Sequence, residues 1–161
     1  RGDSMEENIR WLGQWELEIK EYGQVKEIIP LTPNHITDDG LNMFRDILSG
    51  AISDGQIKYI ALGNDATAPA DEDHTLGSEQ FRKAVTSRNT DPIQPGKLYT
   101  ELYIADTEAN DFKTEEIGFF AGVAAGSGVN TGIMIARILY SRQKAATESW
   151  TIRRTDTISR G

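Results

Sequence analysis

Few residues of this 161-residue sequence have side chains suited to catalysis or metal binding. It contains two histidines, His35 and His74, and no cysteine, which excludes a metal site built on several imidazoles or on thiolates. His74 ends an acidic run that includes Asp71 and Asp73, the one cluster whose side chains could hold a hard cation. Its spacing does not match an EF-hand loop. We therefore expect residues 65–79 to form an exposed, solvated loop that binds no structural metal, and we expect no cofactor.

The sequence contains neither a motif for nucleophilic catalysis nor one for nucleotide binding. Ser127 stands in a Gly-Ser-Gly run, but the sequence contains no G-x-S-x-G nucleophile elbow. Residues 126–132 depart from the dinucleotide-binding fingerprint, because the last glycine comes one residue late and a strand-like segment follows where a helix is required. Carboxylates are abundant, yet no two stand out as a glycosidase pair. The sequence predicts a protein that is not an enzyme.

The charge is strongly acidic and unevenly spread along the chain. Seventeen Lys and Arg against 25 Asp and Glu give a net charge of −8, which disfavours non-specific binding to nucleic acid or an anionic membrane. Residues 137–161 carry +4, so residues 1–136 carry −12. One interpretation is ordinary surface charge. The other is a molecule with opposed faces, in which Arg153 and Arg154 contact an acidic surface of a neighbouring copy and salt weakens the association.

Most segments show the period-2 alternation of half-buried strands. Trp15, Leu17 and Ile19 alternate with charged residues in the first of them, and Gly23 supplies a hairpin turn. The predicted hairpin covers residues 11–33, and further strands are predicted at 56–62, 81–88, 97–105, 115–121, 132–141 and 148–158.

One segment, residues 38–49, predicts a helix. Thr37 or Asp38 can cap its N-terminus. Leu41, Phe44 and Leu48 recur at helical spacing, so we expect them to be buried against a sheet. Replacing a fully buried Phe44 by Ala would cost about 3–5 kcal/mol.

The length and the order of segments predict one domain. The fold class is mainly β (α+β), an antiparallel β-sandwich or barrel-like domain with one helix packed on it. Residues 1–4, Arg-Gly-Asp-Ser, precede Met5 and are interpreted as an expression remnant, which leaves 5–161 as a single β-rich domain. The apolar stretches are too short for a membrane-spanning helix.

Six segments in order resemble the elements of one group of proteins. Residues 34–42 resemble an N-x-I-T-x-x-G-L element, and 56–63 resemble I-x-Y-I-A-L-G. Residues 75–82 are similar to T-x-L-x-x-E-x-x-R, 115–120 to E-I-G-L-F, and 133–141 and 149–152 to closing L-A-R and L-T-I strands. This series is similar to structural proteins of bacteriophage tails, tail fibres and baseplates.

The resemblance implies a non-enzymatic virion component that works by assembly, in a virion built in the bacterial host cytoplasm. Its implied partners are itself, as a homotrimer first and a hexamer second, and other virion proteins. The sequence has no long coiled coil or repeated shaft, so a tail-fibre adaptor, a baseplate component and a capsid decoration protein remain open.

A carbohydrate-binding module is the competing class. Trp11, Trp15 and Trp150 could form a flat platform for sugar rings, and Tyr99 and Tyr103 lie on one face of a predicted strand. Coplanar, solvent-facing aromatic rings would favour this class, whereas buried rings would favour a structural protein.

Overall fold

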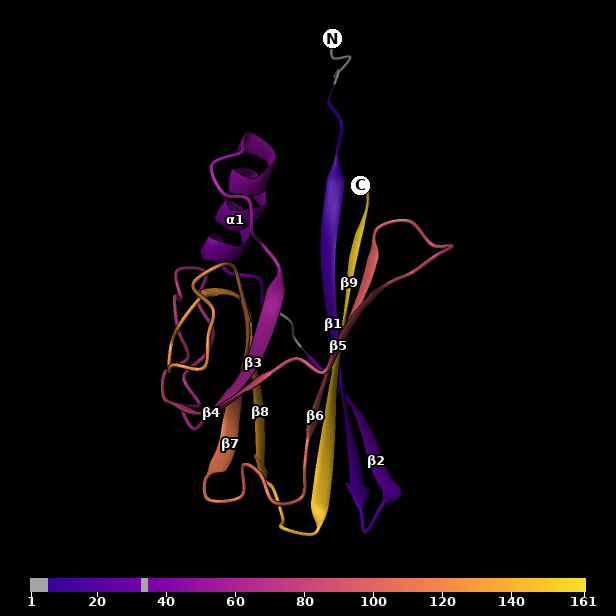
Figure 1. The fold of residues 1–161 in the computed structure, drawn as a ribbon, viewed down its shortest axis with the longest axis vertical. Coiled ribbons are helices and arrows are strands. Elements are labelled where there is room, and N and C mark those ends of the chain that lie inside the picture. Colours follow the sequence, from indigo (N-terminus) through magenta and orange to yellow (C-terminus); the bar gives the residue numbers. More distant parts are fainter. Residues whose placement is uncertain (1–5, 33–34) are drawn as a thin grey trace.

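The computed structural model describes residues 6–32 and 35–161, within which nine strands and one helix form a flattened, barrel-like sandwich (Figure 1). The strands are β1 (Ile9–Glu21), β2 (Gln24–Leu31), β3 (Ile57–Gly63), β4 (Glu79–Ala84), β5 (Ser87–Thr90), β6 (Lys97–Ile104), β7 (Lys113–Ala121), β8 (Ile133–Gln143) and β9 (Glu148–Arg160). The helix α1 is Asp38–Ser49. The predicted mainly β fold with one helix is confirmed. The predicted remnant at residues 1–4 lies outside the described residues.

The first sheet has the strand order β2-β1-β9-β6-β5, and all its pairs are antiparallel. Its two longest strands, β1 and β9, pair along their full 13-residue lengths. Alternation places Leu17 and Ile19 in the core, whereas Glu16 and Glu18 face solvent on the outer side. This sheet therefore has one covered face and one open face.

The second sheet has the order β4-β3-β7-β8 and is buried on both faces. Phe119 faces the core between the sheets, and Phe120 faces a smaller apolar cluster on the outer side, with Leu76 and Met134. Both phenylalanines are fully buried. Loops of the chain cover this outer face, which explains why residues 117–121 of β7 and 133–136 of β8 are apolar without alternation.

The chain closes the sandwich at its two sides. The segment predicted as one strand at 81–88 is in fact β4 followed by β5, which belong to different sheets. The Val85 amide donates to the Lys58 carbonyl at 2.9 Å, and the Thr86 amide donates to the Glu101 backbone carbonyl of the other sheet at 2.7 Å. At the opposite side the Arg142 guanidinium on β8 lies 3.4 Å from the Glu27 carboxylate on β2.

Local sequence fixes both ends of α1. The Thr37 hydroxyl accepts a hydrogen bond from the Gly40 amide at 3.0 Å, which caps the N-terminus. Gly50 ends the helix in the left-handed conformation, with φ +78°. Gly40 lies against β8, where a Cβ atom would come within 2.8 Å of the Ile135 carbonyl. The predicted boundaries, 38–49, are confirmed.

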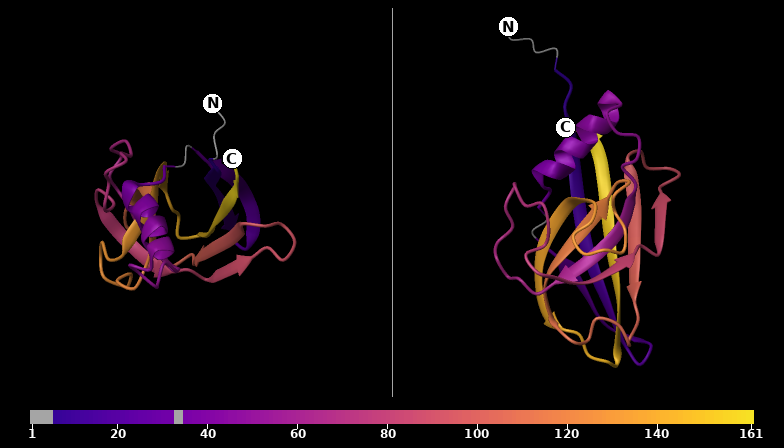
Figure 2. Two further views of the ribbon diagram at one scale, coloured as in Figure 1. Left: turned by 90° about the horizontal axis from the view of Figure 1, so that it is seen from above. Right: turned by 60° about the vertical axis from the view of Figure 1, so that its left-hand side comes forward.

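The predicted buried face of α1 is wrong. Leu41 is 54% exposed and Leu48 is 77% exposed, Phe44 is half-buried, and Met43 is the buried apolar side chain. The reason is the placement of the helix, which leans over one end of the sandwich and does not lie flat on a sheet (Figure 2). Within the described residues, no helix is long and apolar enough to cross a membrane.

Candidate functional site

A buried ion pair lies under residues 65–79, which we call the acidic loop. The Glu116 carboxylate on β7 is fully buried, and its Oε1 lies 2.8 Å from the Arg137 Nε on β8. Three loop amides donate to the same carboxylate: Gly77 at 2.8 Å, Ser78 at 2.9 Å and Asp65 at 3.1 Å. Arginine and backbone donors together satisfy both carboxylate oxygens, so this buried charge is compensated.

Arg137 secures the other half of the loop. Its NH1 donates to the Thr67 carbonyl at 2.8 Å and its NH2 to the Asp65 carbonyl at 3.3 Å. Side chains from two strands of the second sheet, Glu116 of β7 and Arg137 of β8, therefore hold the acidic loop on the sheet. Each charged group of the Glu116–Arg137 pair has its partners inside the fold, so the pair holds the acidic loop in place.

A second ion pair holds residues 122–131, which we call the glycine-rich loop, in the same way. The side chains of Glu79 and Arg82 are 1% and 3% exposed, and their charged groups lie 3.0 Å apart on β4. The Arg82 NH1 donates to the carbonyls of Gly126 and Thr131 at 3.0 and 2.7 Å, and the guanidinium lies 4.2 Å from the Phe120 ring centroid. Ser127 therefore belongs to a loop that is tied down on the sheet.

The acidic loop is partly exposed, as predicted, and partly buried. The side chains of Asp71 and His74 are 71% and 73% exposed, whereas Leu76 is 3% exposed and packs under the loop. Asp71 lies 3.0 Å from His35, and His74 lies 2.6 Å from Asp39 at the start of α1.

Each histidine therefore lies beside one carboxylate, and His74 is hydrogen-bonded to its neighbour. The Asp39 hydrogen bond, followed by its charge, raises the pKa of His74. The Asp73 carboxylate instead accepts from the Ala70 amide at 2.9 Å. In the described residues no group of three or more His, Asp or Glu side chains could hold a metal ion. That the loop binds no metal stays a prediction.

The two arginines chosen as assembly contacts have different environments. Arg154 is 1% exposed, faces the core, bonds to Asp156 at 2.9 Å and lies 4.9 Å from the Trp15 ring centroid. It cannot contact a neighbour from there, so that prediction is wrong, because inward and outward positions alternate along β9. Arg153, the outward one, is 38% exposed.

Arg153 is also engaged within its own sheet. It reaches Glu101 at 2.9 Å, Glu18 at 3.1 Å and Glu16 at 3.3 Å on the two flanking strands. Because basic residues of 137–161 pair across strands with carboxylates of earlier segments, the predicted separation of charge into opposed faces is not what the fold produces.

The tryptophans do not form a platform for sugar rings. Trp15 and Trp150 are 3% and 0% exposed and belong to the core. Trp11 is half-buried, donates to Asp156 at 2.9 Å and packs on Phe44 with ring centroids 5.9 Å apart. Tyr99 and Tyr103 are the exposed members of the predicted set.

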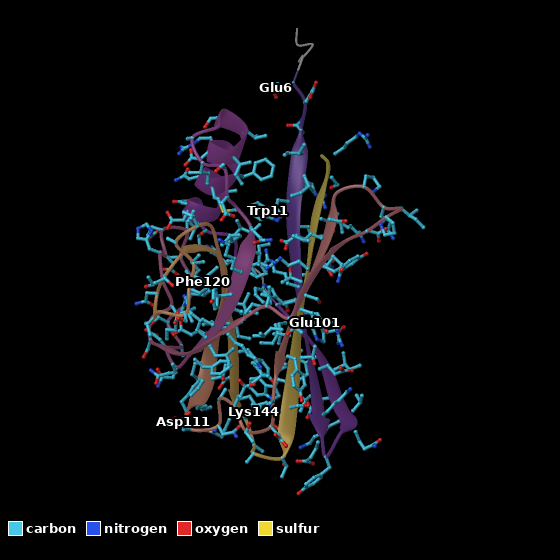
Figure 3. The ribbon with its side chains drawn as sticks, in the orientation of Figure 1. Glu6, Trp11, Glu101, Asp111, Phe120 and Lys144 are labelled. Carbon is cyan, nitrogen blue, oxygen red and sulfur yellow. The ribbon has the colours of Figure 1, made fainter. Side chains whose placement is uncertain are left out.

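An open apolar cleft lies where α1 leans over the sandwich. It is a pocket of about 180 Å³ lined by Ile9 and Trp11 of β1 and by Leu41 and Phe44 of α1, and we call it the apolar cleft. Trp11 extends from β1 toward α1, where its ring contacts Phe44 (Figure 3). Ile9 is 61% exposed and Leu48, one helical turn beyond Phe44, is 77% exposed.

The helical spacing of Leu41, Phe44 and Leu48 is the sequence signal for the apolar cleft, but the sheets of the chain do not fully cover these side chains. The apolar face of an amphipathic helix predicts an apolar contact, but it does not show whether the same chain or another chain covers that face. Here β1 supplies only part of the cover. The exposed remainder is the candidate site for contact with another chain.

No protein-family model matches this sequence, and neither a curated protein nor a solved structure matches it. The similarity to bacteriophage tail proteins therefore stays a prediction.

Proposed function

We propose that the chain is a non-enzymatic structural subunit that works by assembling with copies of itself and with other virion proteins, as a tail, tail-fibre adaptor or baseplate component. The observation that carries the proposal is the apolar cleft. Large apolar side chains from two elements gather there without being covered by the chain itself, the usual mark of a protein contact.

The residues that carry the resemblance support a structural role. Glu79 and Arg82 belong to the T-x-L-x-x-E-x-x-R element, and Glu116 and Arg137 belong to the E-I-G and A-R strands. All four hold loops on the second sheet. This role favours a function in stabilising the fold over one in binding a substrate.

The proposed assembly is a homotrimer first and a hexamer second. Its contact is apolar, because Arg154 is buried and Arg153 is engaged with three glutamates of its own sheet. We therefore replace the expectation that salt weakens association. Burial of apolar surface is not screened by salt, so association should be equal or stronger at high ionic strength.

Sedimentation velocity over a range of protein concentrations, at low and high salt, tests the proposal. The wild-type chain should form a closed oligomer in both buffers. The double variant Leu41→Asp and Leu48→Asp should sediment as a folded monomer, because it places charge in the contact. Val123→Asp is the matched control, since Val123 is 82% exposed and lies outside the apolar cleft, and it should assemble normally. A wild-type monomer at high micromolar concentration in both buffers would contradict self-assembly.

A further inference from the structure

Another concave site lies at the opposite end of the molecule from α1. It is a pocket of about 370 Å³ formed by the β1–β2 turn, the end of β6 and the β8–β9 connection, which lie together in Figure 1. Its lining residues are Tyr22, Gly23, Tyr103, Asp106, Ala146, Thr147 and Ser149, and we call it the tyrosine pocket.

Two aromatic rings from separate elements line the tyrosine pocket. Tyr22 is 80% exposed and Tyr103 is 45% exposed, so both present ring surface to solvent. The Tyr22 amide donates to the Thr147 carbonyl at 3.2 Å, and the Thr147 hydroxyl donates to Glu21 at 3.0 Å. These bonds join the two turns, so the pocket walls are positioned before any ligand arrives.

Tyr22 occupies a backbone position that disfavours tyrosine. It has φ +49° and Gly23 has φ +78°, which together form a two-residue hairpin turn. Such turns favour Asn-Gly, because a side chain with a Cβ is strained at positive φ. A bulky, exposed ring at a strained position points to a use for that ring.

The polar groups of the pocket are open to a ligand. In the described part of the chain, the Asp106 carboxylate, the Ser149 hydroxyl and both tyrosine hydroxyls have no hydrogen-bond partner. The pocket at the acidic loop differs, because Asp65, Asp73 and Arg137 there are already bonded.

We infer that the tyrosine pocket binds a neutral sugar ring. The C–H face of a pyranose packs on an aromatic ring, and its hydroxyls both donate to a carboxylate and bond to hydroxyl groups, which is the combination that Tyr22, Tyr103, Asp106 and Ser149 offer. The lining residues carry one carboxylate and no basic side chain, which selects against acidic sugars. Two lysines lie near the pocket, and each has partners in the fold. The Lys83 ammonium lies 5.7 Å from the Tyr103 ring centroid and pairs with Glu108 at 2.7 Å. The buried Lys144 ammonium donates to the Asn110 side chain at 2.8 Å and to the Asp106 carbonyl at 3.2 Å.

This inference goes beyond the proposed function and does not depend on it, because the tyrosine pocket and the apolar cleft share no residue. A single ring at an open site should bind with a Kd on the order of 1 mM. The probes are glucose, galactose, mannose and N-acetylglucosamine, added singly to the full chain while amide and tyrosine NMR signals are followed.

We expect saturable shifts with at least one of these sugars, confined to residues of the tyrosine pocket, and none with glucuronate or N-acetylneuraminate. Tyr22→Gly should weaken binding about tenfold while the melting temperature stays equal or rises, since glycine relieves the positive φ. Tyr22→Asn tolerates the same φ and should bind as weakly. Asp106→Asn should also weaken binding.

The control is Tyr99→Ala, which removes an exposed ring from the same strand as Tyr103 but outside the pocket. It should leave binding unchanged. The inference is overturned if none of the four sugars shifts signals in the pocket, if acidic sugars bind equally well, or if Tyr22→Gly binds like the wild type. Shifts that depend on protein concentration alone would assign the surface to a second copy and would also overturn it.

Discussion

The outer face of the second sheet and the end of the sandwich at α1 are both apolar, but the chain completes only the first. Loops 64–78 and 122–131 cover Phe120 and Met134, and two buried ion pairs hold those loops in place. At the other region β1 and α1 approach each other and leave Leu41 and Leu48 open to solvent. The comparison separates surface used for stability from surface available to a partner.

The difference has a simple cause in chain length. Residues 64–78 and 122–131 are long connections that fold back over their own sheet and bring polar anchors with them. Residues 50–56, which connect α1 to β3, turn directly into the next strand. No further segment of the described chain is placed over the apolar cleft, whose lining comes from β1 and α1 alone.

The largest effect should come from breaking the closed region. Arg137→Leu leaves the Glu116 carboxylate buried without its guanidinium and should cost about 3–5 kcal/mol of unfolding free energy, measured by chemical denaturation. The double variant Glu116→Leu and Arg137→Leu removes both charges and should recover part of the loss. A cost for Arg137→Leu below about 1 kcal/mol, the value typical of surface pairs, would show that the pair does not hold the loop.

A smaller effect on stability should distinguish the buried face of α1 from its exposed face. Met43→Ala removes a buried side chain and should cost about 2–4 kcal/mol, whereas Leu48→Ala should change the stability of the monomer by at most about 0.5 kcal/mol. Phe44 is half-buried, so Phe44→Ala should cost about 1–2 kcal/mol and not the amount expected for full burial. Thermal unfolding at a concentration where the chain is monomeric measures all three. Equal costs for Met43→Ala and Leu48→Ala would contradict the observed orientation of the helix.

The smallest effect concerns the contact between the acidic loop and α1. Asp39 raises the pKa of His74 above its ordinary 6.5, so this contact stabilises the fold below pH 6.5 and its contribution is lost as the pH rises through the folded pKa. NMR titration should show the raised pKa in the wild type and a return toward 6.5 in Asp39→Asn. Asp71→Asn, which alters the neighbouring His35 pair, should leave the titration of His74 unchanged. An ordinary pKa in the wild type would mean that the His74–Asp39 bond does not persist in solution.

Local patterns predicted the elements well and their partners poorly. The alternation at Leu17 and Ile19 predicted β1, and the capping residue Thr37 with Gly50 sets α1 where it was predicted. Strand register determines which charged residues meet, and no local sequence pattern predicts that register. Arg153 and Arg154 are adjacent in sequence, yet one meets three glutamates on the surface and the other is buried over Trp15.

The same limit applies to the candidate sites. The spacing of Leu41, Phe44 and Leu48 revealed an apolar face, but its exposure depends on how far α1 extends past the sheets. Glu116 and Arg137 come from distant segments and meet only because β7 pairs with β8. The tyrosine pocket likewise joins residues of three separate connections, which no spacing rule relates.

The most direct test of the account is hydrogen exchange measured at low and high protein concentration. If the apolar cleft is the assembly surface, amides of α1 and of residues 9–14 in β1 should become more protected as concentration rises. Amides of loops 64–78 and 122–131, which lie over the outer face of the second sheet, should exchange at the same rate throughout. Protection that rises in those loops or on the outer face of the first sheet, with α1 unchanged, would contradict the account.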